Sequence, residues 1–208
     1  KAEMAVLEKL KPHLEAGNPA RSLELTEDEQ AVVKQYNLLT SKPVIYVANL
    51  DEEGIADPEA VPYFVQVREL AEKEGSEVVA VCAKIEEELS SLDKEEKEMF
   101  LEELGLPQSG LDQLIQKAYK VLGLCTFLTA GEDECRAWTF KQGMKAPDCA
   151  GVIHTDFKRG FIRAEVYRFE DIDELETEQA IKEAGRMRLE GKEYTAQDGD
   201  VMPFRFNV

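Results

Sequence analysis

The stretch that decides the fold is Ala150–Glu165, which reads AGVIHTDFKRGFIRAE. It mixes apolar, hydroxyl, imidazole and charged side chains without the periodicity of a single helix or strand. The segment Lys158–Gly160 is predicted to be a turn that leads into an alternating strand over Phe161–Arg168. So many special residues in so few positions indicate either a functional site or the core of a specific fold.

The residues around this stretch predict a small α+β domain over 124–208. Its turn at Asp198-Gly199-Asp200 is typical of a sharp reversal into a last strand, and the pattern is compatible with a β-grasp. The predicted strands are Thr126–Leu128, Cys135–Phe140, Phe161–Phe169, Glu193–Ala196 and Val201–Phe206, and the predicted helices are Pro147–Ile153 and Glu178–Leu189. Most of the phenylalanines and Trp138 are expected in the core.

The middle of the chain predicts strands that alternate with helices. Val44–Ala48 and Val78–Val81 are continuous apolar runs, as expected of parallel strands covered on both faces. Helices are predicted over Glu59–Glu74, ended by Gly75, and over Leu111–Leu122. Since two strands alone make a poor sheet, we expect partner strands outside this sequence.

The first forty residues predict two helices separated by Gly17-Asn18-Pro19. Apolar residues keep helical spacing up to Leu14, and Thr26 followed by Glu29 is a capping box for the second helix. The sequence begins on Lys1 inside a periodic segment, so we expect it to be part of a longer protein.

Composition limits the possible partners. The 208 residues carry a net charge of −18, with no apolar run near the ~20 residues of a membrane span. A cytoplasmic protein with neither a membrane nor a DNA partner is expected, and no oligomeric state is predicted. Because so acidic a chain binds phosphate backbones poorly, RNA contact requires a local patch; the candidate patch is Lys158, Arg159, Arg163 and Arg168, with Lys141 and Lys145. A solvated strand face with two turns explains the same residues equally well.

The cysteines and histidines indicate no metal site. Four cysteines without a CxxC pair and two histidines do not make a zinc-binding pattern. A thiol hydrolase that uses Cys149 with His154 is a distant alternative, because no neighbouring residue supplies an orienting third group. His154 is expected to be a helix-end or turn residue, with Thr155 and Asp156 capping the local backbone.

Two polar segments follow the apolar strands of the middle region. Asn49-Leu50-Asp51-Glu52 comes after the first strand and Cys82-Ala83-Lys84 after the second. Parallel α/β sheets place binding groups at the carboxyl ends of their strands. GTPases usually carry NKxD and SAK in these two places, and the acid of NKxD pairs with guanine. Leu50 and Glu52 depart from NKxD, and the loss of one bidentate base contact costs about 1–3 kcal/mol of discrimination.

The NxxE pattern and the Ala150–Glu165 run resemble the YchF/Obg-like ATPases. The resemblance covers nearly the whole chain, including Leu7–Leu14, Pro19–Leu23, Leu38–Pro43, Thr129–Gly131, Arg136–Thr139 and Asp198–Asp200. It implies the end of a helical coiled-coil insertion at 1–41. It also implies the C-terminal half of an OBG-type P-loop nucleotide-binding (G) domain at 42–123, and a β-grasp TGS domain at 124–208.

The resemblance also implies a function. Asn49 would bond the adenine edge, Leu50 would contact the base, Ala83 and Lys84 would complete the pocket, and Glu52 belongs to the same motif. The intact family member would hydrolyse ATP, or GTP, and associate with the ribosome and its RNA. No GxxxxGK[ST] loop occurs in the 208 residues, so Mg²⁺ ligands are expected only in the intact protein and this chain alone is expected to be inactive. The alternative is a non-catalytic TGS module that binds RNA, the ribosome or a protein.

Overall fold

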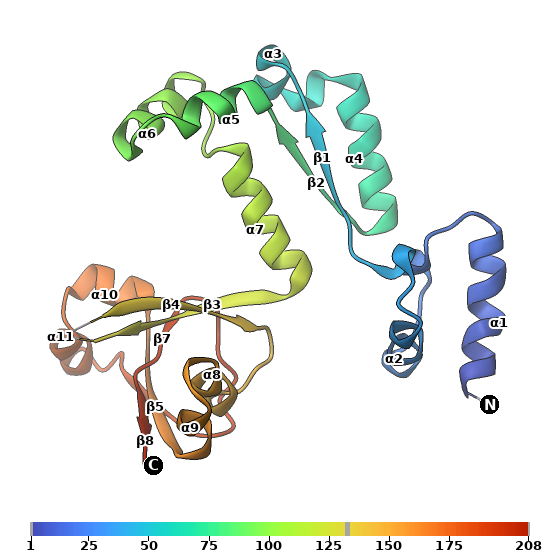
Figure 1. Ribbon diagram of the computed structural model, residues 1–208. Coiled ribbons are helices and arrows are strands. Elements are labelled where there is room, and N and C mark those ends of the chain that lie inside the picture. Colours follow the sequence, from blue (N-terminus) through green and yellow to red (C-terminus); the bar gives the residue numbers. More distant parts are fainter. Residues whose placement is uncertain (1, 132–133, 208) are drawn as a thin grey trace. The chain divides into compact units, whose positions relative to one another are not determined.

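The computed structural model describes residues 2–131 and 134–207 (Figure 1). The chain divides into two compact units, Lys1–Leu122 and Gly123–Val208.

The first unit begins with the two predicted helices. Helix α1 spans Ala2–Glu15 and α2 spans Glu27–Gln35, with 3-10 turns at Ala20–Ser22 and Leu39–Ser41. The capping box is present: Thr26 Oγ1 accepts from the Glu29 amide at 3.4 Å and Glu29 Oε2 accepts from the Thr26 amide at 3.0 Å. A small apolar cluster holds these elements together and consists of Val6, Leu10, Ala20 and Val33.

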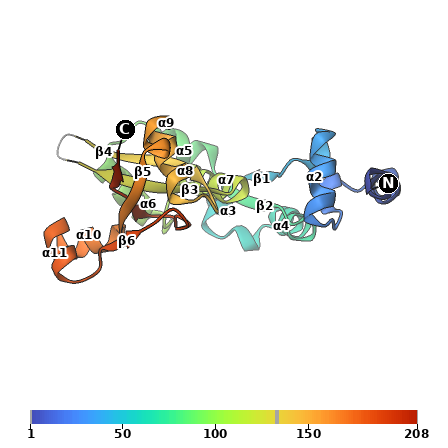
Figure 2. The same cartoon turned by 90° about the horizontal axis from the view of Figure 1, so that it is seen from below.

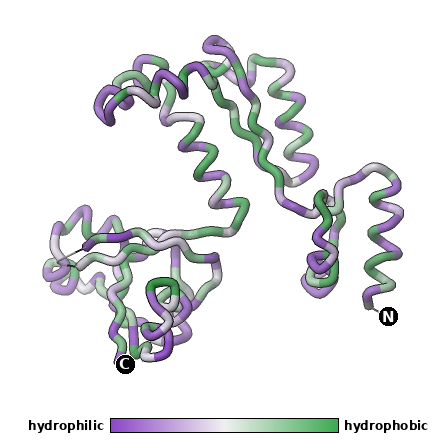
Figure 3. Tube along the Cα trace, viewed as in Figure 1, coloured by the Kyte–Doolittle hydropathy of each residue, from purple (hydrophilic) through white to green (hydrophobic). Residues whose placement is uncertain are grey.

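The rest of the first unit is built on two parallel strands. Strand β1 (Ile45–Asn49) pairs with β2 (Glu77–Val81), and Asn49 lies opposite Val81. The helices are α3 (Glu52–Ala56), a 3-10 turn (Pro58–Ala60), α4 (Pro62–Glu74), α5 (Ala83–Ser90), α6 (Lys94–Glu103) and α7 (Gly110–Leu122). Figure 3 shows apolar residues running along both strands.

The first strand departs from its expected burial. Val47, in the middle of β1, is 48% exposed, whereas Val79 of β2 is 1% exposed. The prediction that both strands are covered on both faces is therefore wrong for β1. Within the described residues β1 pairs with β2 alone, so its other edge has no strand partner.

In its described residues the second unit is one six-stranded sheet with four short helices, and Figure 2 shows it from a second direction. The strand order is β4-β3-β7-β5-β6, and β8 also pairs with β5. The strands are β3 (Leu124–Ala130), β4 (Cys135–Lys141), β5 (Phe161–Arg168), β6 (Arg188–Glu190), β7 (Asp200–Val201) and β8 (Phe204–Phe206). The helices are α8 (Ala146–Ile153), α9 (Thr155–Arg159), α10 (Phe169–Leu175) and α11 (Glu178–Glu183).

Strand β5 contributes to a core on each face of this sheet. Ala164 and Val166 join Phe127, Phe140 and helix α8 in one cluster. Tyr167 joins Ile181 of α11 and Val201 in another. Trp138 packs against the first cluster, as predicted.

Several predicted elements of this unit differ in the structure. Residues Glu193–Ala196 form no strand; only Thr195 makes an isolated bridge, to Lys145. The predicted strand Val201–Phe206 is two strands, interrupted where the Met202 amide donates to the Leu128 carbonyl at 2.8 Å and Pro203 has no amide hydrogen to donate. The helix predicted to end at Leu189 ends at Glu183, since Gly185 adopts a left-handed φ of 70°. The predicted turn at Lys158–Gly160 is the end of helix α9, and α10 was not predicted.

The second glycine of the Ala150–Glu165 run, Gly160, is required for steric reasons. A Cβ on Gly160 would lie 2.2 Å from the carbonyl oxygen of Asn207, and the Asn207 amide donates to the Gly160 carbonyl at 2.9 Å. The strand that follows Gly160 therefore packs directly against the last strand, which leaves no room for a side chain. This part of the run belongs to the fold.

Candidate nucleotide-base site

The structure brings the two polar segments of the first unit together. Because β1 and β2 are parallel, Asn49 and Cys82 leave the same edge of the sheet. Asn49 Oδ1 accepts from the Ala83 amide at 3.0 Å, and the Leu50 amide donates to the Val81 carbonyl at 2.8 Å. One side chain thus ties the first segment to the second.

A second link joins the same two segments. Lys84 Nζ lies 2.5 Å from Glu52 Oε1, and this hydrogen bond raises the pKa of Lys84 above its usual value. The neighbouring carboxylate, Asp51, accepts from the Gly54 amide at 2.8 Å and caps α3. Both carboxylates of the NLDE segment therefore already have protein partners.

The hydrogen-bond donor that is left unused in this site, the side-chain amide of Asn49, suits the edge of a purine base. Asn49 is exposed, and no residue in the described ranges accepts a hydrogen bond from its Nδ2 amide. An amide donor held in a fixed orientation by its own oxygen can bond an acceptor on a base. Half-buried Leu50 lies next to it in sequence and offers an apolar surface. The five predicted residues thus lie on two segments that the fold joins.

An ionic network behind β1 was missed by sequence reasoning. Arg21 Nη2 lies 2.6 Å from Glu74 Oε2, and the hydroxyl of Tyr46 donates to the same oxygen at 2.9 Å. Arg21 lowers the pKa of Glu74, and Glu74 raises the pKa of Tyr46. These residues fix the start of the strand that ends in Asn49. No short motif marks them, because they lie 53 positions apart at the extremes.

The cysteine and histidine residues do not form a catalytic pair. Cys149 is fully buried, and its burial raises the pKa of the thiol to about 12, which is the reverse of nucleophile activation. His154 Nδ1 accepts from the Asp156 amide at 3.2 Å and caps α9. The cap is thus His154 itself, not Thr155 or Asp156 as predicted. In the described part of the chain, no group of three or more His, Cys, Asp or Glu side chains is placed to hold a metal ion.

The structure places the four residues of the predicted RNA patch at the end of helix α9 and at two points along β5. Lys158 pairs with Asp148 at 2.6 Å and Arg159 with Asp156 at 3.7 Å. Arg168 lies at the opposite end of β5 from Arg159, which precedes the strand. Arg163 makes no ion pair or hydrogen bond through its side chain with any described residue.

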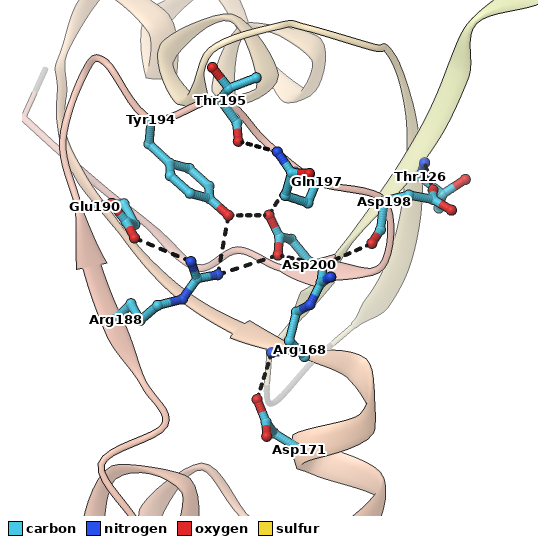
Figure 4. Close-up of polar contacts among 10 residues, drawn as sticks. All are labelled: Thr126, Arg168, Asp171, Arg188, Glu190, Tyr194, Thr195, Gln197, Asp198 and Asp200. Carbon is cyan, nitrogen blue, oxygen red and sulfur yellow. Dashed lines mark hydrogen bonds and ion pairs between the residues drawn. The ribbon is translucent and has the colours of Figure 1, made fainter.

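Arg168 belongs to a buried network around Asp200 (Figure 4). Asp200 is fully buried, and it accepts from Tyr194 Oη at 2.7 Å and from the Gln197 amide at 2.8 Å. The guanidinium groups of Arg168 and Arg188 lie 3.3 and 3.6 Å from its Oδ1. The Asp198-Gly199-Asp200 turn was the visible signal of this network, whose contacts connect β5, β6 and β7. These contacts make Arg168 part of the fold.

Comparison with known proteins identifies relatives along the whole chain. The YchF-GTPase_C family model, described as a protein of unknown function (DUF933), matches residues 124–207. The ribosome-binding ATPase YchF of Bacillus subtilis (strain 168) is 58% identical over 206 residues, which are 99% of this chain and 56% of that protein. The protein of the same name from Escherichia coli O157:H7 is 51% identical over 208 residues, again 56% of its length. The chain thus spans little more than half the length of these relatives.

Solved structures agree with the sequence matches. The YchF GTPase of Schizosaccharomyces pombe superposes with a TM-score of 0.86 at 32% identity, over 98% of this chain and 54% of that one. A GTP-binding protein from Pyrococcus horikoshii OT3 has a TM-score of 0.58 at 18% identity and shows likeness of fold alone. Among the described residues, no helix is both long and apolar enough to cross a membrane.

Proposed function

Because the chain belongs to the YchF family, we propose that it is the base-recognising and ribosome-associating part of a cytoplasmic ATPase. In this proposal residues 1–41 end a helical coiled-coil domain. Residues 42–123 are the C-terminal half of a P-loop G domain, and residues 124–208 are a β-grasp TGS domain. The relatives' name, ribosome-binding ATPase, supports ATP as the nucleotide and the ribosome as the partner of the longer protein.

The observation that carries the proposal is the bond between Asn49 Oδ1 and the Ala83 amide. It joins the two segments that the fold delivers to one edge of the parallel sheet, where α/β proteins bind ligands. With its oxygen engaged, the Asn49 amide is left to donate to the purine. Leu50 covers the base, while Ala83 and Lys84 form the other side of the pocket.

The Glu52–Lys84 pair supports adenine over guanine. Guanine presents N–H donors that a free carboxylate accepts, whereas the Glu52 carboxylate is held by Lys84 and the Asp51 carboxylate by the Gly54 amide. Carboxylates that already have protein partners offer guanine fewer free acceptor positions, which reduces the preference for guanine. ATP is therefore the proposed nucleotide, and GTP a weaker one.

Phosphoryl transfer in this proposal requires a phosphate-binding loop, which the 208 residues do not contain. When bound, Mg²⁺ would neutralise charge on the phosphates, and its ligands would lie in that other part of the protein. The present chain orients the base, and we expect it to bind ATP no tighter than millimolar and to hydrolyse none.

Two measurements test the base site in this chain. Isothermal titration with ATP and Mg²⁺ should show no binding tighter than millimolar, and a micromolar constant would contradict the proposal. Saturation-transfer NMR at millimolar ATP should show contact to the adenine protons, and Asn49→Ala should abolish it. Asn18→Ala is the matched control, because Asn18 is exposed in the same unit and lies outside both segments. Equal transfer in both variants would place the base elsewhere.

A second function is favoured by the second unit taken alone. This unit has the sheet covered on both faces and the family match over residues 124–207. A non-catalytic module that binds RNA, the ribosome or a protein through this unit needs no nucleotide. The test is co-sedimentation of the chain with ribosomes. If the parent and Asn49→Ala co-sediment equally, and if ATP makes no difference to either, this second function is the better description.

A further inference from the structure

The first half of β5 contains a charge arrangement that works against its own stability. Arg163 lies directly opposite Arg205 of β8 in the antiparallel ladder. Like charges directly opposite each other destabilise a strand pair. Conflicts of this kind, in an otherwise consistent sheet, are expected at functional positions.

One carboxylate, Glu165, lies on the same face and relieves the conflict only in part. Glu165 is 8% exposed, and its two oxygens lie 3.2 and 3.3 Å from Nε and Nη2 of Arg205. Arg205 lowers the pKa of Glu165, and Lys182 and Arg163 add smaller effects in the same direction. Three cations thus face one carboxylate, and Arg205 engages both of its oxygens. Arg163 is left exposed without a partner in the described residues.

Two apolar side chains flank these charges. Ile162 is 56% exposed and adjoins a bulge in the ladder, and Leu189, opposite Glu165 on β6, is 64% exposed. We define the Arg163 strip by six residues, which are Ile162, Arg163, Glu165, Lys182, Leu189 and Arg205. The charge of Glu178 also acts on Arg205. When Glu178 is counted with the strip, the net charge of these residues is +1. Residues 124–208 as a whole carry 12 Lys and Arg against 17 Asp and Glu.

Other arginines of this unit contrast with Arg163. Arg159, Arg168, Arg186 and Arg188 each lie within 4 Å of a carboxylate. An anion placed over the strip would find a free guanidinium in Arg163 and a second one beside it in Arg205, whose side chain is 58% exposed. It would also remove the repulsion between them.

We propose that the Arg163 strip binds the phosphodiester backbone of ribosomal RNA. The inference rests on the proposed association with the ribosome and names the surface and the chemistry of that contact. Each planar guanidinium group can donate two parallel hydrogen bonds to the oxygens of one phosphate. The side chains of Ile162 and Leu189 pack against sugars or unstacked bases. The surface therefore shifts from the four residues expected from sequence to Arg163 and its ladder partner Arg205.

The test uses the whole chain and two matched charge reversals. Arg163→Glu removes the free guanidinium, whereas Arg159→Glu makes the same change at an exposed arginine that already faces Asp156. Each variant is co-sedimented with ribosomes and titrated with deproteinised ribosomal RNA over a range of salt concentrations. Arg163→Glu should weaken RNA binding about tenfold or more, as expected for one charge-assisted contact. It should also reduce the salt slope by about 0.7 per lost phosphate contact on single-stranded RNA. Arg159→Glu should have much the smaller effect.

A folding control keeps the result interpretable. Since Arg163 is exposed and unpaired, Arg163→Glu should unfold at the same temperature as the parent or higher, because the repulsion with Arg205 is gone. Arg163→Lys keeps the charge and loses the fork, and should bind with intermediate affinity.

Three outcomes would overturn the inference. If the parent binds ribosomes and Arg163→Glu binds equally well, the strip is not the contact while the proposed association stands. If the parent does not co-sediment with ribosomes, the proposed association fails and the inference fails with it. If the parent binds ribosomes but not deproteinised RNA, and Arg163→Glu loses the ribosome, the partner is an acidic protein surface and RNA is excluded.

Discussion

Strands β1 and β5 show how differently the two units are built. In β5, Ala164, Val166 and Tyr167 are fully buried, and both faces of the strand carry a core. In β1, the central Val47 is 48% exposed, and Asn49 at its end is exposed too. Among the described residues, ten apolar side chains are buried in the first unit and thirteen in the shorter second unit.

The second unit is stabilised mainly by its apolar core, whereas the first unit depends more on individual hydrogen bonds and ion pairs. The second unit buries apolar surface at high density and adds the Asp200 network. The first unit depends on small clusters and on links such as Arg21–Glu74 and Asn49–Ala83. Binding loops are commonly drawn from the less stable parts of a protein, and the proposed base site lies in the first unit. The three predictions below test this contrast.

The largest effect is expected at Asp200. Asp200→Ala should destabilise the second unit by about 2–5 kcal/mol, because the Tyr194 hydroxyl and the Gln197 amide lose their acceptor and each unsatisfied group costs about 1–3 kcal/mol. Trp138 is the only tryptophan and lies in this unit, so urea unfolding followed by its fluorescence reports the loss directly. Asp173→Ala, at an exposed position, is the control and should change the free energy of unfolding by less than about 0.5 kcal/mol. Similar losses in both variants would mean that the network does not stabilise the sheet.

An effect of intermediate size is expected when valine is replaced by threonine in β5, and a much smaller one when the same replacement is made in β1. Val166→Thr puts a hydroxyl into the fully buried core of β5 and should cost about 1–3 kcal/mol. Val47→Thr puts it on the half-exposed face of β1, where water satisfies the hydroxyl, and should change stability by less than about 0.5 kcal/mol. Unfolding followed by tryptophan fluorescence measures the first, and hydrogen exchange of the β1 amides measures the second. Equal costs would show that the exposed face of Val47 is covered in solution.

Local signals predicted the elements that depend on neighbours in sequence. The capping box at Thr26, the left-handed Gly75 that ends α4 and the two apolar parallel strands are confirmed. These features depend on groups within a few residues of one another, or on apolar runs that any buried strand requires.

Long-range contacts explain what the sequence did not predict. The last predicted strand is interrupted where the Met202 amide donates to the Leu128 carbonyl of β3, a contact between residues far apart in sequence. The basic patch included Arg168, because nothing near it in sequence shows that it faces the buried Asp200. Arg205 was absent from the patch, because only the ladder register places it opposite Arg163. For the proposed base site, the strand ends predicted that the two segments meet at one edge of the sheet, but the Glu52–Lys84 pair depends on the distance between two loops.

The smallest effect concerns the pH dependence of the second unit. Arg205 holds the pKa of Glu165 below its usual value in the folded chain, whereas the unfolded value is about 4.3. The pair therefore stabilises the fold above the unfolded pKa, and this contribution is lost as the pH falls through the lower folded pKa. Glu165→Gln removes the titration, so the difference in free energy of unfolding between parent and variant that is present at pH 7 should shrink steadily below about pH 4. Glu170→Gln, at an exposed position, should instead follow the parent across the whole range in tryptophan-monitored urea unfolding. If the Glu165→Gln difference stays constant down to pH 2.5, the stabilisation comes from packing of the side chain and the ionic pair with Arg205 contributes nothing.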